Sequence, residues 1–219
     1  MGIHADQISQ IKEAIEEKLL IAKLAIDLKK PSGGGCHGYP AALLLFSIID
    51  TIGSFHRGSE NFSVTFSDGE TTRIGAEGRH HFYVLSSKFF ECSLTRKEAE
   101  IIYDNYRNVL DHNSTLPSFR LLSNAAGNAQ PFEFKPGHSI IYLPALYAKT
   151  EGAVKLFLST IHEVADSLAL KAILKKGEWT DRPVPLESLQ VVAASGVFYP
   201  AAVSGSFLDA SAFPEVGTF

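Results

Sequence analysis

The chain has 219 residues, of which 45% are hydrophobic and 20% are charged. This length fits one domain or two small ones, and it is enough to bury a sizeable core without disulfides. The formal net charge of −4 at neutral pH excludes a global electrostatic argument for nucleic-acid binding, so such binding would need a local basic patch.

Two long helices are predicted near the N-terminus. Apolar residues recur at spacings of three and four in residues 6–29, which is typical of an amphipathic helix, and Pro31 with the glycines after it ends this helix. The apolar run from Pro40 to Phe55 predicts a second helix that is buried on most sides. Asp50 interrupts this run, which is too short for a membrane span, so we expect a core helix and no membrane association.

The middle of the chain is predicted to hold a turn region and a third long helix. Residues 61–75 alternate enough around "SDGE" to predict a weak hairpin, with a flexible loop as the alternative, and residues 80–90 predict a short helix. Thr95 and Glu98 have the spacing of a capping box, which predicts the start of a helix that ends near His112. The apolar stripe of this helix is predicted to consist of Ala99, Ile102, Tyr103, Tyr106 and Leu110.

The C-terminal part is predicted to begin with a small β-hairpin in residues 119–144. Two short apolar stretches flank turn-forming residues there, and the second stretch is rich in β-prone side chains. A long helix then runs from Pro144 to a break at Gly177, and residues 184–197 predict one more helix.

Together these elements predict a mainly α-helical bundle with a small β-hairpin insertion. We expect residues 1–198 to form a single α-helical domain and residues 199–219, rich in Ser, Ala, Gly and Pro, to form an irregular C-terminal tail. Cys36 and Cys92 are far apart and lack a neighbouring thiol. This pattern indicates a reducing, cytoplasmic compartment and favours neither a disulfide framework nor a CxxC metal site.

Three motifs that resemble reactive sites have a simpler structural interpretation. "HEVAD" has Asp166 where a zinc protease helix has a second histidine, so a metal-dependent hydrolase near His162 is only a third alternative. His80 and His81 are adjacent, point about 100° apart on a helix and would not chelate one metal together. The glycines of "SGGGCHG" follow a helix rather than a strand, which indicates a connection rather than a phosphate loop.

The segment "NYRNVLDHN" at residues 105–113 has two interpretations. In the structural one, Arg107 forms surface ion pairs with Asp104 or Asp111, which lie three and four residues away on the helix. His112 then gains from its place near the helix C-terminus, where the macrodipole favours a cation. In this interpretation the polar residues are a solvated helix end.

In the functional interpretation, Arg107, Asn108 and His112 share one cleft. Asn108 and His112 are four residues apart on one helix face, whereas Arg107 is about 140° from His112 on a regular helix. The three would meet if the helix unwinds near Asp111 or packs against a partner that supplies the other wall. Histidine moves protons near neutral pH and arginine binds phosphate oxygens, so the group suits RNA cleavage, in which the 2′-OH is the nucleophile.

The segment "RNVLDH" resembles the Arg-x4-His signature of HEPN domains, in the form in which a polar residue follows the arginine. In that family the signature also lies toward the end of a helix within an α-helical bundle. More loosely, "IIYDNYRNVLDHN" is similar to segments of uncharacterised bacterial HEPN-like proteins. The resemblance is confined to this segment, and the predicted helices elsewhere are compatible with it.

The resemblance implies a metal-independent endoribonuclease without a cofactor, of the kind found in toxin–antitoxin, abortive-infection and CRISPR systems. Arg107 would bind and polarise the scissile phosphate, His112 would act as acid or base, and Asn108 would support both. It further implies a homodimer with the active site built across the two chains, RNA as the substrate, and an antitoxin or regulatory protein as a further partner. The products would be a 2′,3′-cyclic phosphate and a 5′-OH.

The alternative is a non-catalytic helical interaction or RNA-binding module that dimerises. Some HEPN proteins have lost catalysis, and the acidic net charge departs from that of a typical RNA binder. In this alternative, Arg107 and His112 stabilise the end of a helix or the interface of a dimer.

Overall fold

The computed structural model describes residues 5–31, 33, 35–113 and 115–165. The chain divides into two units, residues 1–177 and 178–219, and the described residues all belong to the first. The elements in chain order are α1 (Ala5–Asp27), α2 (Gly38–Phe55), β1 (Val64–Thr65), β2 (Thr71–Thr72), α3 (Gly78–His81), η1 (Phe82–Ser86), α4 (Arg96–Ile102), η2 (Tyr103–Arg107), α5 (Asn108–Asn113), β3 (Arg120–Ser123), β4 (Phe132–Lys135), β5 (His138–Tyr142) and α6 (Leu143–Ala165).

Several predictions concern residues outside the described part of the chain. They are the continuation of the last helix to Gly177, the helix at residues 184–197, and the boundary between a domain of residues 1–198 and a tail of residues 199–219. These stay predictions.

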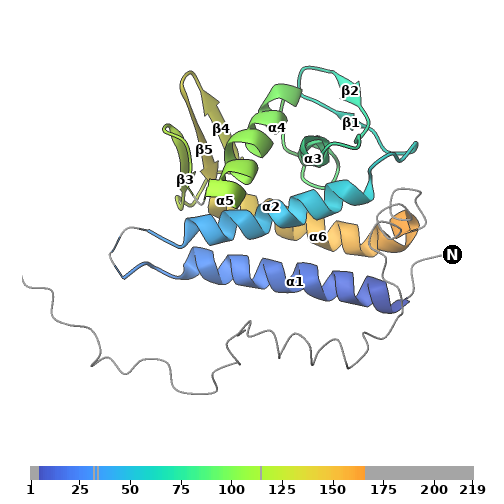
Figure 1. Ribbon diagram of the computed structural model, residues 1–219, viewed down its shortest axis with the longest axis horizontal. Coiled ribbons are helices and arrows are strands. Elements are labelled where there is room, and N and C mark those ends of the chain that lie inside the picture. The colour runs from blue at the N-terminus through green and yellow to red at the C-terminus, as the bar shows by residue number, and fades with distance from the viewer. Residues whose placement is uncertain (1–4, 32, 34, 114, 166–219) are drawn as a thin grey trace, which may run out of the picture. The chain divides into compact units, whose positions relative to one another are not determined.

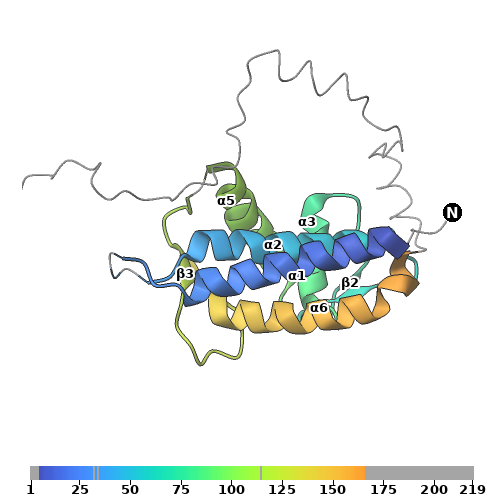
Figure 2. The same ribbon diagram turned by 90° about the horizontal axis from the view of Figure 1, so that it is seen from below.

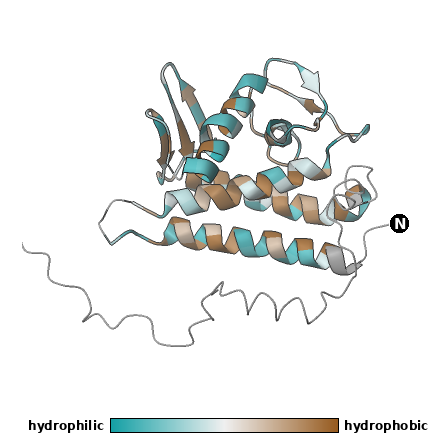
Figure 3. Cartoon of the chain, in the orientation of Figure 1, coloured by the Kyte–Doolittle hydropathy of each residue, from teal (hydrophilic) through white to brown (hydrophobic). Residues whose placement is uncertain are grey.

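The predicted mainly helical character is confirmed, and helices α1, α2 and α6 pack against one another along their lengths (Figures 1 and 2). Helix α2 is apolar along most of its length, whereas polar and apolar residues alternate along α1 (Figure 3). By length and composition α2 would suit a membrane span, but half of it is buried in the core, as in a central helix of a soluble protein. Leu45, Phe46 and Ile49 are fully buried there.

Helix α4, the π-helical turn η2 and helix α5 form one continuous helical segment that begins at the predicted capping box. The Thr95 Oγ1 atom accepts a hydrogen bond from the Glu98 N–H at 3.2 Å, and the Glu98 carboxylate accepts one from the Thr95 N–H at 2.8 Å. Tyr106 and Leu110 are buried as predicted, while Tyr103 is half-buried. This segment lies on the side of α2 opposite to α1 (Figure 1).

The predicted hairpin near "SDGE" is confirmed as the antiparallel pair β1–β2. The predicted short helix over residues 80–90 differs from the structure, because the single turn of α3 passes into the tighter η1 and ends at Ser86. Residues 82–85 of η1 are consecutive and all fully buried. An amphipathic helix needs a polar side that faces solvent, and these residues leave no such side for a longer helix.

The prediction of a β-hairpin in residues 119–144 was correct in part. Strands β4 and β5 form the antiparallel hairpin, with Gly137 in the turn at φ = 83°. Strand β3 also joins β5, in parallel, which makes a three-stranded sheet in the order β3-β5-β4. Local turn signals do not encode this pairing, because parallel strands meet through a crossover distant in sequence.

His56 follows α2 and provides a pH-dependent contribution to stability. The residue is 5% exposed, its ring stacks on Phe62 with 4.0 Å between centroids, and burial lowers its pKa to about 4. As the pH falls below about 6.5, His56 binds a proton in the unfolded chain but stays neutral in the folded chain. The free energy of unfolding therefore decreases as the pH falls from about 6.5 to about 4.

We expect His56→Phe to remove this part of the pH dependence. Between pH 7 and pH 5 the wild type should lose roughly 2 kcal/mol more free energy of unfolding than the variant. Urea denaturation at both pH values measures the difference. Equal losses in the two proteins would show that His56 is not held neutral in the folded state.

Candidate active site

Arg107 ends the π-helical turn η2, and its side chain is held by two carboxylates and a ring. Its guanidinium nitrogens lie 3.3 Å from an Asp50 oxygen and 3.4 Å from an Asp111 oxygen, and the group stacks over the Tyr103 ring at 5.6 Å. The predicted pairing with Asp111 is therefore confirmed, while Asp104 does not pair with Arg107. The side chain is 27% exposed, so part of it faces solvent.

Asp50 joins Arg107 to a histidine from a third element. One Asp50 oxygen contacts Arg107, and the other lies 2.7 Å from the Nδ1 atom of His81 in α3. The His81 side chain is 13% exposed, and its Nε2 atom is buried without a hydrogen-bond partner in the described part of the chain. One carboxylate in the central helix thus orients an imidazole and a guanidinium at the same place.

Sequence reasoning missed both Asp50 and His81. In the sequence, Asp50 is visible only as an interruption of an apolar helix, and His81 only as a neighbour of His80. A lone carboxylate in an otherwise apolar core helix is the signal that points to Asp50, because a half-buried acid needs a cationic partner. No comparable signal marks His81, since its pairing depends on how α3 packs on α2.

Two glycines allow this close packing. A Cβ atom on Gly53 would lie 2.1 Å from the carbonyl oxygen of His81, so α3 reaches α2 only because Gly53 has no side chain. A Cβ atom on Gly78 would lie 2.8 Å from the hydroxyl of Tyr103, the residue whose ring lies beneath Arg107. The glycines thus bring α2, α3 and η2 together at Asp50.

Asn108 and His112 lie on α5, directly after Arg107. Asn108 is half-buried and His112 is exposed, and neither side chain forms a hydrogen bond or ion pair within the described residues. Helix α5 runs unbroken through Asp111 to Asn113, so the expected unwinding near Asp111 is absent. Arg107 and His112 therefore stay about 140° apart on the helix, and a single chain does not place them side by side by helix geometry alone.

The other histidine motifs carry no metal cluster in the described part of the chain. His162 and Glu163 on α6 are both exposed, and no group of three or more His, Cys, Asp or Glu residues there is placed to hold a metal ion. Asp166, the other candidate ligand, lies outside the described residues. His80 is half-buried, and its ring lies 5.0 Å from that of Tyr83.

The chain matches no family model, and no curated protein or solved structure matches it. The features of this chain that bear on its function are the geometry around Arg107 and the short motif that contains it.

Proposed function

We propose that the chain is a metal-independent endoribonuclease of the HEPN type, acting in the cytoplasm in a toxin, phage-defence or stress-response system. The observation that carries the proposal is the fixed Arg107 guanidinium, partly open to solvent, on the same helical segment as the exposed His112. Both residues belong to the motif "RNVLDH", and no metal or cofactor is needed for the chemistry they offer.

Arg107 is suited to bind the scissile phosphate because its ion pairs leave donors free. A guanidinium has five N–H donors in a rigid fork, and Asp50 and Asp111 each contact one of its terminal nitrogens. The remaining donors fit two oxygens of a phosphodiester and stabilise the charge that develops on them. Prior orientation by the carboxylates lowers the entropy lost when the phosphate binds.

In the proposed reaction the RNA supplies its own nucleophile. The 2′-oxygen forms a bond to phosphorus while the bond from phosphorus to the 5′-oxygen breaks. A histidine takes the proton of the 2′-OH or returns one to the 5′-oxygen, and His112 is free to do so because it has no partner among the described residues. Asn108 supports the pair, and the products are a 2′,3′-cyclic phosphate and a 5′-OH.

We further propose that the active species is a homodimer. The separation of Arg107 and His112 around α5 supports this, since a second copy can provide the wall on which the two side chains converge. A cytoplasmic location is supported by Cys36 and Cys92, which are free and buried. Burial raises the pKa of Cys92 to about 12, so this thiol stays unreactive.

A second candidate is a non-catalytic interaction module that dimerises. This second candidate is supported by the ion pairs of Arg107. They connect η2 to Asp50 in α2 and to Asp111 in α5, so the arginine can serve to stabilise the fold. Leu20 and Leu24 on α1, with Leu28 directly after its end, also form an exposed apolar strip of the kind that protein partners cover. Both functions predict a dimer, so a cleavage assay is needed to separate them.

The test is incubation of the purified protein with mixed RNA in EDTA. We expect wild-type protein to release fragments with 2′,3′-cyclic phosphate ends and His112→Ala to do so about 100-fold or more slowly, because one proton-transfer group is lost. His112 is exposed, so the variant should keep its fold.

His162→Ala is the matched control, because His162 is also exposed and lies on α6. It should cleave RNA at the wild-type rate. Absence of cleavage by wild-type protein, or equal rates for wild type and His112→Ala, would favour the interaction module.

A further inference from the structure

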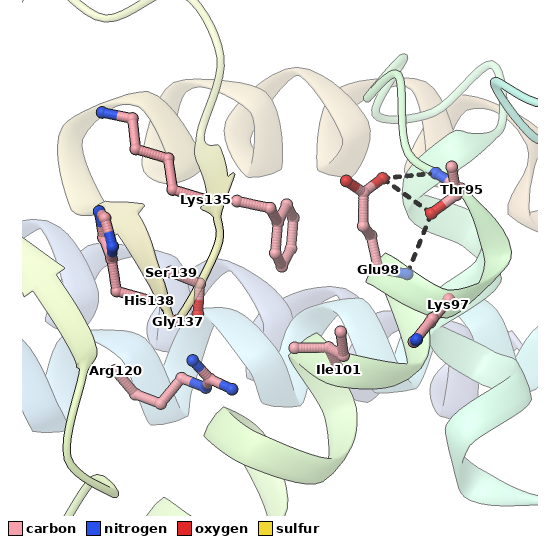
Figure 4. Close-up of a pocket in the computed structure, with 10 residues that line it drawn as sticks. Thr95, Lys97, Glu98, Ile101, Arg120, Lys135, Gly137, His138 and Ser139 are labelled. Carbon is pink, nitrogen blue, oxygen red and sulfur yellow. Dashed lines mark hydrogen bonds between the residues drawn. The ribbon is translucent and has the colours of Figure 1, made fainter.

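A second site candidate is a cavity of about 300 Å³ between the first turn of α4 and the β4–β5 hairpin (Figure 4). It is separate from the cluster around Asp50, because none of its lining residues belongs to that cluster. The lining residues are Thr95, Lys97, Glu98, Ile101, Arg120, Phe134, Lys135, Gly137, His138 and Ser139.

The charges around this cavity are mainly positive. Lys97, Arg120 and Lys135 line it together with one carboxylate, that of Glu98. Glu98 is already engaged, since it accepts hydrogen bonds from the N–H and the hydroxyl of Thr95 (Figure 4). Lys97 and Arg120 have no acidic partner among the described residues, whereas Lys135 pairs with Glu133. The cavity is therefore a local basic patch on a chain whose formal net charge is −4.

The register of the sheet explains how arginine and phenylalanine come to share this cavity. Arg120 of β3 and Phe134 of β4 both pair with Ser139 of the central strand β5. Side chains of residues in register project from the same face of a sheet, so the three form one row across the strands. Ser139 is 2% exposed and is bound by the Tyr106 hydroxyl, which fixes the row against the helical segment.

The cavity thus combines cations that bind an anion with an apolar wall. Lys97 and Arg120 supply N–H donors to its lining, and Phe134 and Ile101 supply apolar surface. A volume of about 300 Å³ lies at the lower end of the range for small-molecule sites. A single nucleotide has this chemistry, with a phosphate for the cations and a base that packs on an aromatic ring.

We propose that this cavity binds one nucleotide of a single-stranded RNA, with its phosphate at Lys97 and Arg120 and its base against Phe134. The inference rests on the proposed ribonuclease function, for which the cavity would hold a nucleotide that flanks the cleaved bond. Ile101 of the cavity and Arg107 belong to one continuous helical segment, about 9 Å apart along its axis. On a regular α-helix six residues turn about 600°, so the two side chains lie on different sides of the segment and an RNA strand that reaches both must pass around it.

The test measures binding rather than cleavage. A fluorescein-labelled 2′-O-methyl RNA oligonucleotide lacks the nucleophilic hydroxyl, so it binds without being cut, and fluorescence anisotropy gives its Kd over a range of salt concentrations. We expect Lys97→Glu and Arg120→Gln each to raise Kd about tenfold at low salt. For each lost phosphate contact, the slope of log K against log salt should become shallower by about 0.7.

Further variants distinguish binding at the cavity from a general effect of surface charge. Lys155→Glu changes another exposed lysine, on α6 and outside the cavity, and should leave Kd unchanged. Phe134→Leu keeps the apolar wall but removes the ring, and it should weaken binding about fivefold or more through lost stacking. Lys97 is exposed, so its variant tests the site even if Phe134→Leu disturbs the sheet.

The outcomes distinguish this site from the proposed catalysis. If wild type cleaves RNA but the Lys97 and Arg120 variants bind the oligonucleotide as wild type does, the nucleotide site is wrong and the ribonuclease stands. If these variants weaken binding while wild type cleaves no unmodified RNA, the site stands and the ribonuclease is wrong. No binding by wild type, or equally strong binding of a poly-glutamate peptide at the same residues, would overturn the nucleotide site.

Discussion

Arg107→Ala is expected to lower the rate of RNA cleavage about 100-fold to 1000-fold. Arg107 is the only proposed catalytic group with a permanent positive charge, and loss of one preoriented donor to a developing oxyanion has an effect of this size. The fold should survive, because Asp50 keeps its contact with His81 when the arginine is removed. Single-turnover cleavage of a labelled RNA in EDTA, with circular dichroism to check folding, measures the effect.

Two further variants sharpen this test. Arg107→Lys keeps the charge but lacks the planar fork, so it cannot hold Asp50, Asp111 and a phosphate together, and we expect it to remain at least tenfold below wild type. Arg73→Ala removes an exposed arginine without an ion pair in the described part of the chain, and it should cleave as wild type does. Wild-type activity in Arg107→Ala would rule out the proposed mechanism.

Gly53→Ala is expected to lower the free energy of unfolding by about 3 kcal/mol. The added Cβ would lie 2.1 Å from the backbone oxygen of His81, and neither the helix backbone of α2 nor that of α3 can give way cheaply. Relief requires α3 to move away from α2, which also separates His81 from Asp50. Urea denaturation measures the loss, and the cleavage assay measures the consequence for the site.

Gly152→Ala is the matched control, with the opposite expected sign. Gly152 is also a helical glycine, in α6, but it is exposed and a Cβ there would meet nothing within 4 Å. Alanine has the higher helix propensity, so this variant should be more stable by about 0.5–1 kcal/mol. If both glycine variants gain stability, the close contact of α2 with α3 does not exist as described.

The elements with local signals were predictable from the sequence. The periodic apolar pattern of α1, the apolar run of α2 and the capping box at Thr95 each depend on residues within a few positions of one another. These patterns determine the mainly helical class. They also located the segment that contains Arg107, Asn108 and His112, and the ion pair of Arg107 with Asp111, because residues four apart on a helix are neighbours.

The contacts that complete the candidate site were decided only by tertiary structure. Asp50 and Arg107 are 57 positions apart, and Asp50 and His81 are 31 apart, so no local pattern links them. The parallel pairing of β3 with β5, which places Arg120 beside Ser139, is likewise non-local. Sequence by itself determined which helices form and where the polar motif lies along one of them. The packing of helices at close contacts such as Gly53 decided which distant charged residues lie next to that motif. Such contacts depend on how whole elements fit together, so no local sequence pattern encodes them.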